Sequence, residues 1–413
     1  MVNVLVIGNG ARESALGQAF LKSQAVEQVY VAPGNAAMAL LGLTVLPLGE
    51  ADFSNLIQFA KTHVALTFVG PEAPLAAGIV DAFQKADLPI FGPTQKLAQL
   101  ESSKQFAKAF MQRHHLPTAQ AQVVNSQAEA LAVLAKYGAP IVIKADGLAA
   151  GKGVTVAQTV DAAKQAITNL YTGHPQASVV IEEYLTGQEA SVLALFNGMT
   201  HVSFPLAQDH KRRFDGDLGP NTGGMGAISP APQFSASQQA QAQALIDQTL
   251  AAMVVDGLYG NGVLYIGLMF TKAGPKILEY NLRFGDPETQ VLLPQVQNDF
   301  YQLVSDLMHD QADQLQLDGQ TYCGVVAANP GYPTDTSQHL PLIVPDATQR
   351  QYWYPAGVRQ GTNGLESTGG RIFTVVGSGA DLAAAQKQAY ARLKPLLGAL
   401  ADRQDIGFHA LGQ

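Results

Sequence analysis

Cysteine is almost absent from this sequence: Cys323 stands alone among 413 residues, so no disulfide can form within the chain. Chains without disulfides are typical of reducing compartments, and we expect a cytoplasmic protein. Long hydrophobic runs are absent as well, because no uncharged apolar stretch approaches the roughly 20 residues that cross a bilayer. The first residues carry neither a basic segment nor a cleavage site of small residues, so they predict no signal peptide.

Charge is also sparse, and positive charge is the scarcer sign. Only 14% of the residues are charged, with 25 Lys and Arg against 33 Asp and Glu and a formal net charge of −8. Such a chain has no general attraction to nucleic acid or to an anionic membrane, and we expect it to bind neither. An anionic substrate would have to be held locally, by single Lys and Arg side chains and by backbone N–H groups.

Apolar residues, at 47%, and glycine, at 40 copies, are abundant. A chain of this length exceeds one compact core and predicts two to four domains. The combination is typical of an α/β enzyme with many tight turns and ligand-binding loops.

The first ~100 residues alternate short apolar runs with amphipathic stretches, a pattern that predicts a parallel sheet with crossover helices. Glycine-bearing loops follow the predicted strands, at the carboxyl ends that form the ligand crevice of an open α/β sheet. The predicted strands are Val2–Ile7, Gln28–Ala32, Leu66–Val69 and Pro89–Phe91.

Beyond this region the apolar pattern predicts both helices and strands, with one exception. Between Ser203 and Pro230 there is little periodicity, and an irregular loop of this length in a compact domain is expected to be functional. The predicted strands are Ile141–Lys144, Val154–Val156, Val179–Glu183, Glu189–Phe196, Val263–Thr271, Lys276–Tyr280, Cys323–Ala328 and Arg371–Gly377. The predicted helices are Lys104–Arg113, Val160–Leu170, Ser235–Met253, Glu288–Val296, Asp299–Met308 and Ala380–Leu393.

The turn at Gly8–Gly10, between a strand and a helix, could hold a phosphate on its backbone N–H groups beside Arg12. The alternative is a turn whose glycines serve only packing. A dinucleotide is disfavoured, because Glu13 occupies the place of a third small residue and no acid ends the second predicted strand. A nicotinamide oxidoreductase is therefore a poor alternative.

The glycine-rich loop between Lys144 and Val154 is more specific. It differs from a Walker P-loop in its spacing, and strands flank it on both sides. We interpret it as a flexible hairpin that folds over a triphosphate, with two lysines providing charge; a solvated turn is the structural alternative. The strand at Ile181–Leu185 could then contact an adenine through its backbone, and Glu189 could accept hydrogen bonds from ribose hydroxyls.

A strand places Glu279 and Asn281 on one face, because residues i and i+2 of a strand point the same way. Carboxylate and amide oxygens are suitable ligands for Mg²⁺ bridged to phosphates. Arg283, which follows at once, could clamp a transferring phosphoryl group. The charged run Gln208–Arg212 and the glycine-dense run Gly219–Gly226 suit an enclosed anionic substrate, although ordinary surface ion pairs are the commoner use of such charges.

Together these segments resemble the phosphoribosylamine–glycine ligase family of the ATP-grasp superfamily, over nearly the whole chain. The most specific matches are Gln208–Arg212, Gly219–Gly226 and Arg283–Gln290. The resemblance implies an α/β and α+β multidomain fold: a pre-ATP-grasp Rossmann-like N-domain, a two-part ATP-grasp domain and a small C-terminal α/β domain. The expected bounds are 1–100 for the N-terminal domain, 101–120 for a connecting helix, 121–188 for the ATP-grasp lid, 189–320 for the central domain and 321–413 for the C-terminal domain.

The resemblance also implies a reaction of de novo purine biosynthesis. The carboxylate of glycine attacks the γ-phosphate of ATP, which gives glycyl phosphate and ADP. The amine of 5-phosphoribosylamine then displaces phosphate and forms glycinamide ribonucleotide. The implied metal is Mg²⁺ or Mn²⁺, and we expect a monomer or a weak homodimer.

By the same resemblance, Arg283, Lys211 and Asp209 are expected to be catalytic, and Glu279 and Asn281 to hold the metal. ATP is expected at Lys104, Lys144, Gly147, Gly151, Lys152, Gly153, Glu182, Glu183, Tyr184, Leu185 and Glu189. The other substrates are expected at Gly8, Asn9, Gly10, Arg12, Asn35, Pro71, Glu72, Asn221, Thr222, Gly223, Gly285 and Asp286.

The sequence departs from the family pattern without losing any proposed metal or ATP contact. The departures are Ser14, where histidine is usual, Leu218, Thr368, Phe408 and His409. The alternatives are another ATP-grasp carboxylate–amine ligase with different substrates and a catalytically silent nucleotide-binding regulator. Such a regulator would be expected to lose Glu279, Asn281 or Arg283.

Overall fold

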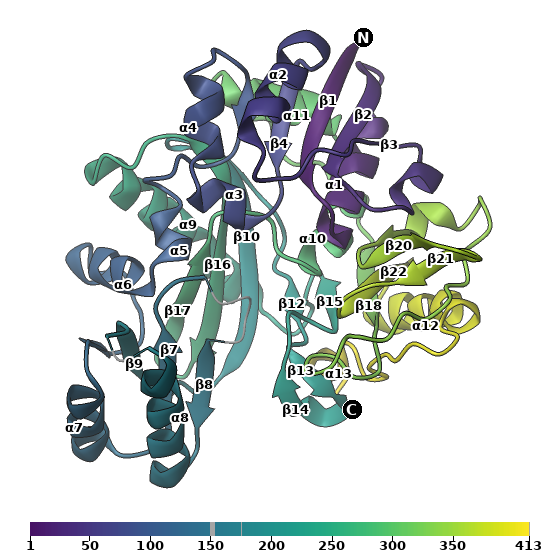
Figure 1. Cartoon of the computed structure of the whole chain (residues 1–413). Helices are drawn as coiled ribbons and strands as arrows, with labels where there is room; N and C mark the ends of the chain where they lie inside the picture. The colour runs from purple at the N-terminus through teal and green to yellow at the C-terminus, as the bar shows by residue number, and fades with distance from the viewer. Residues whose placement is uncertain (149–152, 175, 413) are drawn as a thin grey trace.

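The computed structural model describes residues 1–148, 153–174 and 176–412. These residues form four sheets of four or five strands and two small two-stranded sheets. Figure 1 shows the N-terminal sheet at the top, a small lobe at the lower left, the central sheet between them and the C-terminal sheet on the right.

The N-terminal sheet is parallel throughout, as predicted, with strand order β3-β2-β1-β4-β5. Alternate residues of β1 face opposite layers: Val4 and Val6 pack in a core with helix α1, while Leu5 and Ile7 pack with helices α2 and α4. The bounds are β1 (Val2–Gly8), α1 (Ala11–Leu21), β2 (Val26–Pro33), β3 (Thr44–Val45), α2 (Phe53–His63), β4 (Leu66–Val69), α3 (Glu72–Ala76), α4 (Ile79–Gln84) and β5 (Ile90–Phe91).

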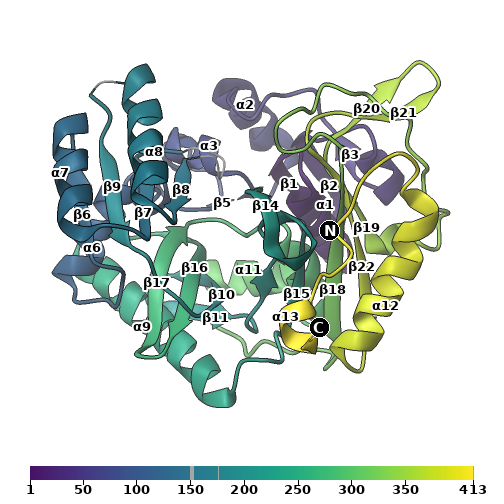
Figure 2. The same cartoon turned by 90° about the horizontal axis from the view of Figure 1, so that it is seen from below.

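The small lobe is an antiparallel sheet of order β6-β9-β7-β8, covered by helices α7 and α8, with a hydrophobic core of its own. Figure 2 shows this lobe on the left, well apart from the C-terminal part of the chain. Its elements are β6 (Ala121–Val124), α7 (Gln127–Tyr137), β7 (Ile141–Ala145), β8 (Val154–Ala157), α8 (Val160–Gly173) and β9 (Val179–Glu183).

The central sheet is antiparallel, with order β11-β10-β16-β17. It lies between the small lobe and the C-terminal sheet. Its strands are β10 (Gln188–Asn197), β11 (Thr200–Ser203), β16 (Asn261–Thr271) and β17 (Gly274–Asn281). The helices around it are α5 (Gln99–Ser102), α6 (Lys104–Arg113), α9 (Ala236–Val255), α10 (Glu288–Leu292) and α11 (Phe300–Met308).

The C-terminal sheet has order β12-β15-β18-β22-β19, and helix α12 packs on β18 and β22. The prediction of an irregular loop from Ser203 to Pro230 is wrong, because this segment contains four short strands; β15 pairs with β18, far along the chain. The elements are β12 (Gln208–Asp209), β13 (Arg212–Phe214), β14 (Leu218–Asn221), β15 (Gly226–Ser229), β18 (Thr321–Ala328), β19 (Trp353–Pro355), β20 (Val358–Gly361), β21 (Gly364–Ser367), β22 (Arg371–Gly379), α12 (Leu382–Leu393) and α13 (Phe408–Leu411).

Within the described ranges, no helix combines the length and the apolar character that crossing a membrane requires.

Candidate active site

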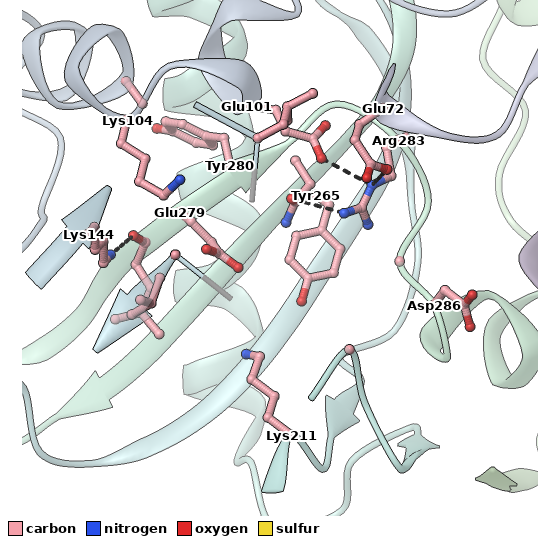
Figure 3. A pocket seen from close by; sticks show the side chains of 18 of the residues that line it. Glu72, Glu101, Lys104, Lys144, Lys211, Tyr265, Glu279, Tyr280, Arg283 and Asp286 are labelled. Atoms are coloured by element: carbon pink, nitrogen blue, oxygen red, sulfur yellow. Dashed lines mark hydrogen bonds and ion pairs between the residues drawn. The ribbon is translucent and has the colours of Figure 1, made fainter. Parts of the chain in front are cut away.

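A cavity of about 470 Å³ lies where the N-terminal domain, α6, the small lobe, the central sheet and the C-terminal sheet meet. Figure 3 shows its side chains converging from these different elements. Charged residues line it, among them Arg12, Glu72, Lys104, Lys144, Asp209, Lys211, Glu279, Arg283 and Arg371.

Strand β17 brings Glu279 and Asn281 to this cavity, as the spacing of the two residues predicts. Burial acts to raise the pKa of Glu279, but Lys211, Lys144, Arg283 and Lys104 outweigh burial and lower the pKa below its ordinary value. Glu279 is therefore an ionised carboxylate at neutral pH, a suitable oxygen ligand for a hard cation.

Arg283 is held between two carboxylates. Its Nε lies 3.1 Å from Glu101 Oε1 and 3.4 Å from Glu72 Oε2, and Nη2 donates to Asn281 Oδ1 at 3.3 Å. Glu101 is fixed in turn, because its Oε2 accepts a hydrogen bond of 2.7 Å from the Leu282 backbone N–H. Burial lowers the pKa of Arg283, but Glu101 and Glu72 outweigh it and raise the pKa, so the guanidinium stays charged.

Two lysines face the same cavity, Lys104 from helix α6 and Lys144 from strand β7. Lys104 begins helix α6, where the Asp146 carboxylate accepts a 2.6 Å hydrogen bond from its backbone N–H. The Lys104 ammonium donates to the Gly147 carbonyl at 2.8 Å. Lys144, on β7, forms a 2.9 Å ion pair with Glu182 Oε2. The hydrogen bonds of Lys104 to Asp146 and Gly147 thus join α6 to the small lobe beside the cavity.

Asp209 ends β12 and Lys211 follows it by two residues, on the side of the cavity nearest the C-terminal sheet. The Lys211 ammonium lies 3.0 Å from Glu189 Oε2 and 3.5 Å from Asp209 Oδ1. Burial raises the pKa of Asp209 to about 7, with Glu288, Glu189 and Glu279 adding to the rise and Lys211 opposing it. Burial lowers the pKa of Lys211, but Asp209 and Glu189 outweigh it and hold the pKa well above its ordinary value.

A second cavity of about 190 Å³ continues the first, since both are lined by Lys144, Glu182, Lys211 and Glu279. Its walls are largely apolar, formed by Ala119, Val142, Val156, Met269 and Leu278. The predicted residues Glu183, Tyr184, Leu185, Glu189 and Asn221 lie along its edge. Apolar walls of this kind suit an aromatic base.

Most of the predicted residues gather at these two cavities, but some do not. The first cavity also takes in Gly147, Gly153, Thr222, Gly223, Gly285 and Asp286. Five predicted substrate residues line neither of the two: Gly8, Asn9, Gly10, Asn35 and Pro71. Gly151 and Lys152 lie outside the described residues.

The side chain of Asn35 joins domains instead. Its amide donates to the Asn9 carbonyl at 2.9 Å and to the Pro355 carbonyl at 3.1 Å. Ser14, a departure from the family pattern, is fully buried and donates to the same Pro355 carbonyl at 2.6 Å. The departure therefore lies in the packing between α1 and β19.

Sequence reasoning missed several residues that line the larger cavity. Arg371 of β22 donates to the carbonyls of Gly223, at 2.8 Å, and Asp286, at 2.6 Å. Tyr265 of β16 donates to Glu288 Oε1 at 2.9 Å, and Glu288 also belongs to the cavity wall. The segment that ends at Arg371 resembles a family motif, which is the signal that could have identified it; Tyr265 stands in an apolar strand that gave no such signal.

A nucleotide-sized cavity between an antiparallel lobe and a central antiparallel sheet, lined by lysines and a strand-borne carboxylate, defines an ATP-grasp protein. The fold agrees with solved ATP-grasp structures. An N5-carboxyaminoimidazole ribonucleotide synthetase solved as an ADP complex matches 95% of this chain and 96% of its own, with a TM-score of 0.67 at 13% identity.

The chain belongs to the phosphoribosylglycinamide synthetase family, whose N domain matches residues 2–101, ATP-grasp (A) domain residues 102–289 and C domain residues 322–409. The phosphoribosylamine–glycine ligase of Lactococcus lactis is 44% identical over 99% of this chain and 100% of its own length. That of Halalkalibacterium halodurans is 43% identical over 100% and 98%. The crystal structure of the Thermotoga maritima ligase covers 98% of this chain and 100% of its own, with a TM-score of 0.86 and 32% identity.

Proposed function

We propose that this chain ligates glycine to 5-phosphoribosylamine with ATP, forming glycinamide ribonucleotide, ADP and phosphate in purine biosynthesis. The observation that carries the proposal is the meeting of Lys104 and Lys144, Glu279 and Asn281, and Arg283 around one cavity. Membership of the family and 42–44% identity to full-length ligases support the choice of substrates.

The smaller cavity suits the adenine, and the triphosphate would extend past Lys144 and Lys104 toward β17. Glu279 and Asn281 would hold Mg²⁺ or Mn²⁺ together with phosphate oxygens, because a hard divalent cation commonly takes one or two protein oxygens and completes its shell from the nucleotide. When bound, the metal supplies positive charge that offsets the charge on the phosphates.

The first step forms an O–P bond between the glycine carboxylate and the γ-phosphorus while the bond to ADP breaks. Arg283, fixed by Glu101 and Glu72, is placed to neutralise the equatorial oxygens of the transferring group. The chain needs no nucleophile of its own, since glycyl phosphate is itself the activated intermediate. Orientation and charge neutralisation therefore account for the catalysis.

In the second step the amine nitrogen bonds to the carbonyl carbon of glycyl phosphate, and phosphate leaves with the C–O electron pair. The nitrogen must also lose a proton. Asp209 is our candidate acceptor, because it lines the cavity and burial brings its pKa to about 7. Lys211, charged and 3.5 Å away, would stabilise the departing phosphate.

The test is a reaction of the purified chain with ATP, Mg²⁺, glycine and freshly generated 5-phosphoribosylamine, followed by mass spectrometry of the products. We expect glycinamide ribonucleotide and ADP in equal amounts, and neither when glycine is omitted. ADP formation with another small carboxylic acid but not with glycine would overturn the substrate assignment.

We further propose a cytoplasmic enzyme that is a monomer or a weak homodimer. Light scattering behind a sizing column, at several protein concentrations, measures the oligomeric state. A stable tetramer would contradict the proposal.

A further inference from the structure

Lys108 is a buried lysine to which the proposed reaction gives no role. It lies on α6 one turn after Lys104, and only 3% of it is exposed. An ammonium group in such a position is costly unless it is paired and fully hydrogen-bonded. Its partners therefore indicate what it does.

The Lys108 ammonium has three protein partners, two hydrogen-bond acceptors and one ion-paired carboxylate. Glu182 Oε1 lies 3.0 Å away, Thr118 Oγ1 lies 2.7 Å away and the Ala119 carbonyl lies 3.4 Å away. Thr118 can accept because its own hydroxyl proton goes to the Ile277 carbonyl at 2.7 Å. The Lys108 ammonium thus faces protein groups, although the residue lies at the cavity wall.

Lys144 and Lys104 differ from Lys108 in this respect. Among the described residues, the Lys144 ammonium has two partners: it lies 2.9 Å from Glu182 Oε2 and donates to the Leu278 carbonyl at 3.1 Å. The Lys104 ammonium donates to the Gly147 carbonyl, its one hydrogen-bond acceptor in the part of the chain that the structure describes. Within that part of the chain, Lys108 therefore has more protein partners than Lys144 or Lys104, which favours Lys144 and Lys104 as the lysines that contact phosphate.

Glu182 connects these lysines, with one carboxylate oxygen on Lys108 and the other on Lys144. It is 3% exposed, so water contributes little to its stabilisation. Two ammonium groups around one carboxylate leave a net positive charge, whereas Lys144 and Glu182 alone would cancel. Burial lowers the pKa of Lys108, and Glu182 opposes that shift without overcoming it.

We propose that Lys108 is a positioning residue for the nucleotide: through Glu182 it fixes the Lys144 ammonium at the cavity wall and keeps its positive charge available to the phosphates. The inference rests on the proposed nucleotide site. It distinguishes Lys108 from the two lysines expected to touch ATP.

The test uses Lys108→Met, which removes the charge, and Lys108→Gln, which also removes it but keeps a hydrogen-bond donor for Glu182. Calorimetric titration of the full chain with MgATP is expected to show about tenfold weaker binding in both variants. Adenosine, which has no phosphates, should bind within about twofold of the wild type. In turnover, KM for ATP should rise about tenfold while kcat at saturating ATP changes by less than about threefold.

A double variant tests the route through Glu182. In Lys108→Met/Glu182→Gln the carboxylate that would otherwise neutralise Lys144 is gone, so MgATP should bind more tightly than to Lys108→Met alone. Lys96→Met is the matched control, because Lys96 is an exposed lysine that donates to the Gly257 carbonyl, and its affinity should not change. Thermal unfolding of each variant verifies that it is folded; if Lys108→Met is not, Lys108→Gln and the double variant are the comparison.

MgATP affinity within twofold of the wild type in a folded Lys108 variant would overturn the inference. So would an equal loss for adenosine, or a double variant no better than the single one. Failure of the wild type to bind MgATP would instead refute the proposed nucleotide site, so the two failures are distinguishable.

Discussion

At the scale of single residues, Glu279 combines a buried position with a retained negative charge. Lys211, Lys144 and Arg283 lower its pKa, which is the condition for a metal ligand at neutral pH. Glu279→Gln keeps the shape and removes the charge. We expect kcat for ADP formation to fall by about 10²-fold or more, with little change in thermal unfolding temperature. Steady-state assays over a range of Mg²⁺ concentration measure the loss, and Glu366→Gln, on the exposed β20–β21 hairpin, is the control.

Asp209 gives a pH prediction. Burial raises its pKa to about 7, so the carboxylate is protonated below that pH and can accept a proton above it. The kcat/KM for the amine substrate should rise as pH increases through about 7, and Asp209→Asn should lower the rate by about 10²-fold and abolish this rise.

Titration of the Asp209 carboxylate also changes the stability of the fold with pH. Because the folded state raises the Asp209 pKa above its ordinary value of 3.8, its stabilising effect is complete below that value and is lost as pH rises through about 7. Unfolding temperatures of the wild type and Asp209→Asn should therefore diverge across this window. An unchanged pH–rate profile in the variant would remove Asp209 from the proton transfer.

At the scale of elements, the segment that carries Asp209 is attached to the C-terminal segment through His210. This histidine is 1% exposed, and its Nε2 accepts a 2.9 Å hydrogen bond from the Gly407 backbone N–H. Burial lowers its pKa to about 3, with Arg403 and His409 adding to the decrease and Asp217 and Asp405 opposing it. His210 is therefore a neutral acceptor at physiological pH.

This pairing predicts acid sensitivity. Because the folded state depresses the His210 pKa from 6.5 to about 3, the stability that the neutral ring provides is present above 6.5 and is lost as pH falls toward 3. The loss should reach roughly 3 kcal/mol at pH 4. His210→Gln, which keeps an acceptor for Gly407, should show a smaller loss. Denaturant unfolding at pH 7, 5 and 4 compares the two chains, and parallel losses would contradict the assignment.

Many elements with several buried apolar residues were predictable, because burial imposes a pattern that the sequence displays. Strands β4 and β9 and helix α6 have the predicted bounds. The short strands β12 to β15 were not predictable, since each has at most two apolar residues and β15 finds its partner in the distant β18. Helix α7 had a sequence signal that was overlooked, a serine followed three residues later by a glutamate, which is typical of a helix N-terminus. In the structure Ser126 accepts a hydrogen bond from the Glu129 N–H, and the Glu129 carboxylate accepts one from the Asn125 N–H.

The site shows the same division. Glu279 and Asn281 were predictable because residues that are two positions apart on one strand lie on the same face. Asn35 shows what motif matching cannot distinguish, since its amide is used between domains rather than in either cavity. Arg371 reaches Asp286 and Gly223 only through the packing of the C-terminal sheet against the centre, which no local pattern displays.

At the scale of the whole molecule, the single cysteine provides a measure of global unfolding. Cys323 lies in β18, is fully buried, and burial raises its pKa to about 12. Both effects keep the reactive thiolate scarce in the native state. Thiol-specific labelling should therefore be slow in the native protein and reach one thiol per chain in denaturant. Rapid labelling under native conditions would mean that the C-terminal sheet opens on its own.

Trp353 provides a fluorescence signal from one defined place in the molecule. It is the only tryptophan in the chain, is 1% exposed, and lies on β19 where α1 of the N-terminal domain packs and Gln18 donates to its carbonyl. Intrinsic indole fluorescence therefore originates at one seam between the first and last parts of the chain. An emission change during a reaction would report that seam parting, while movements of the distant β6–β9 lobe alone would leave the spectrum unaltered.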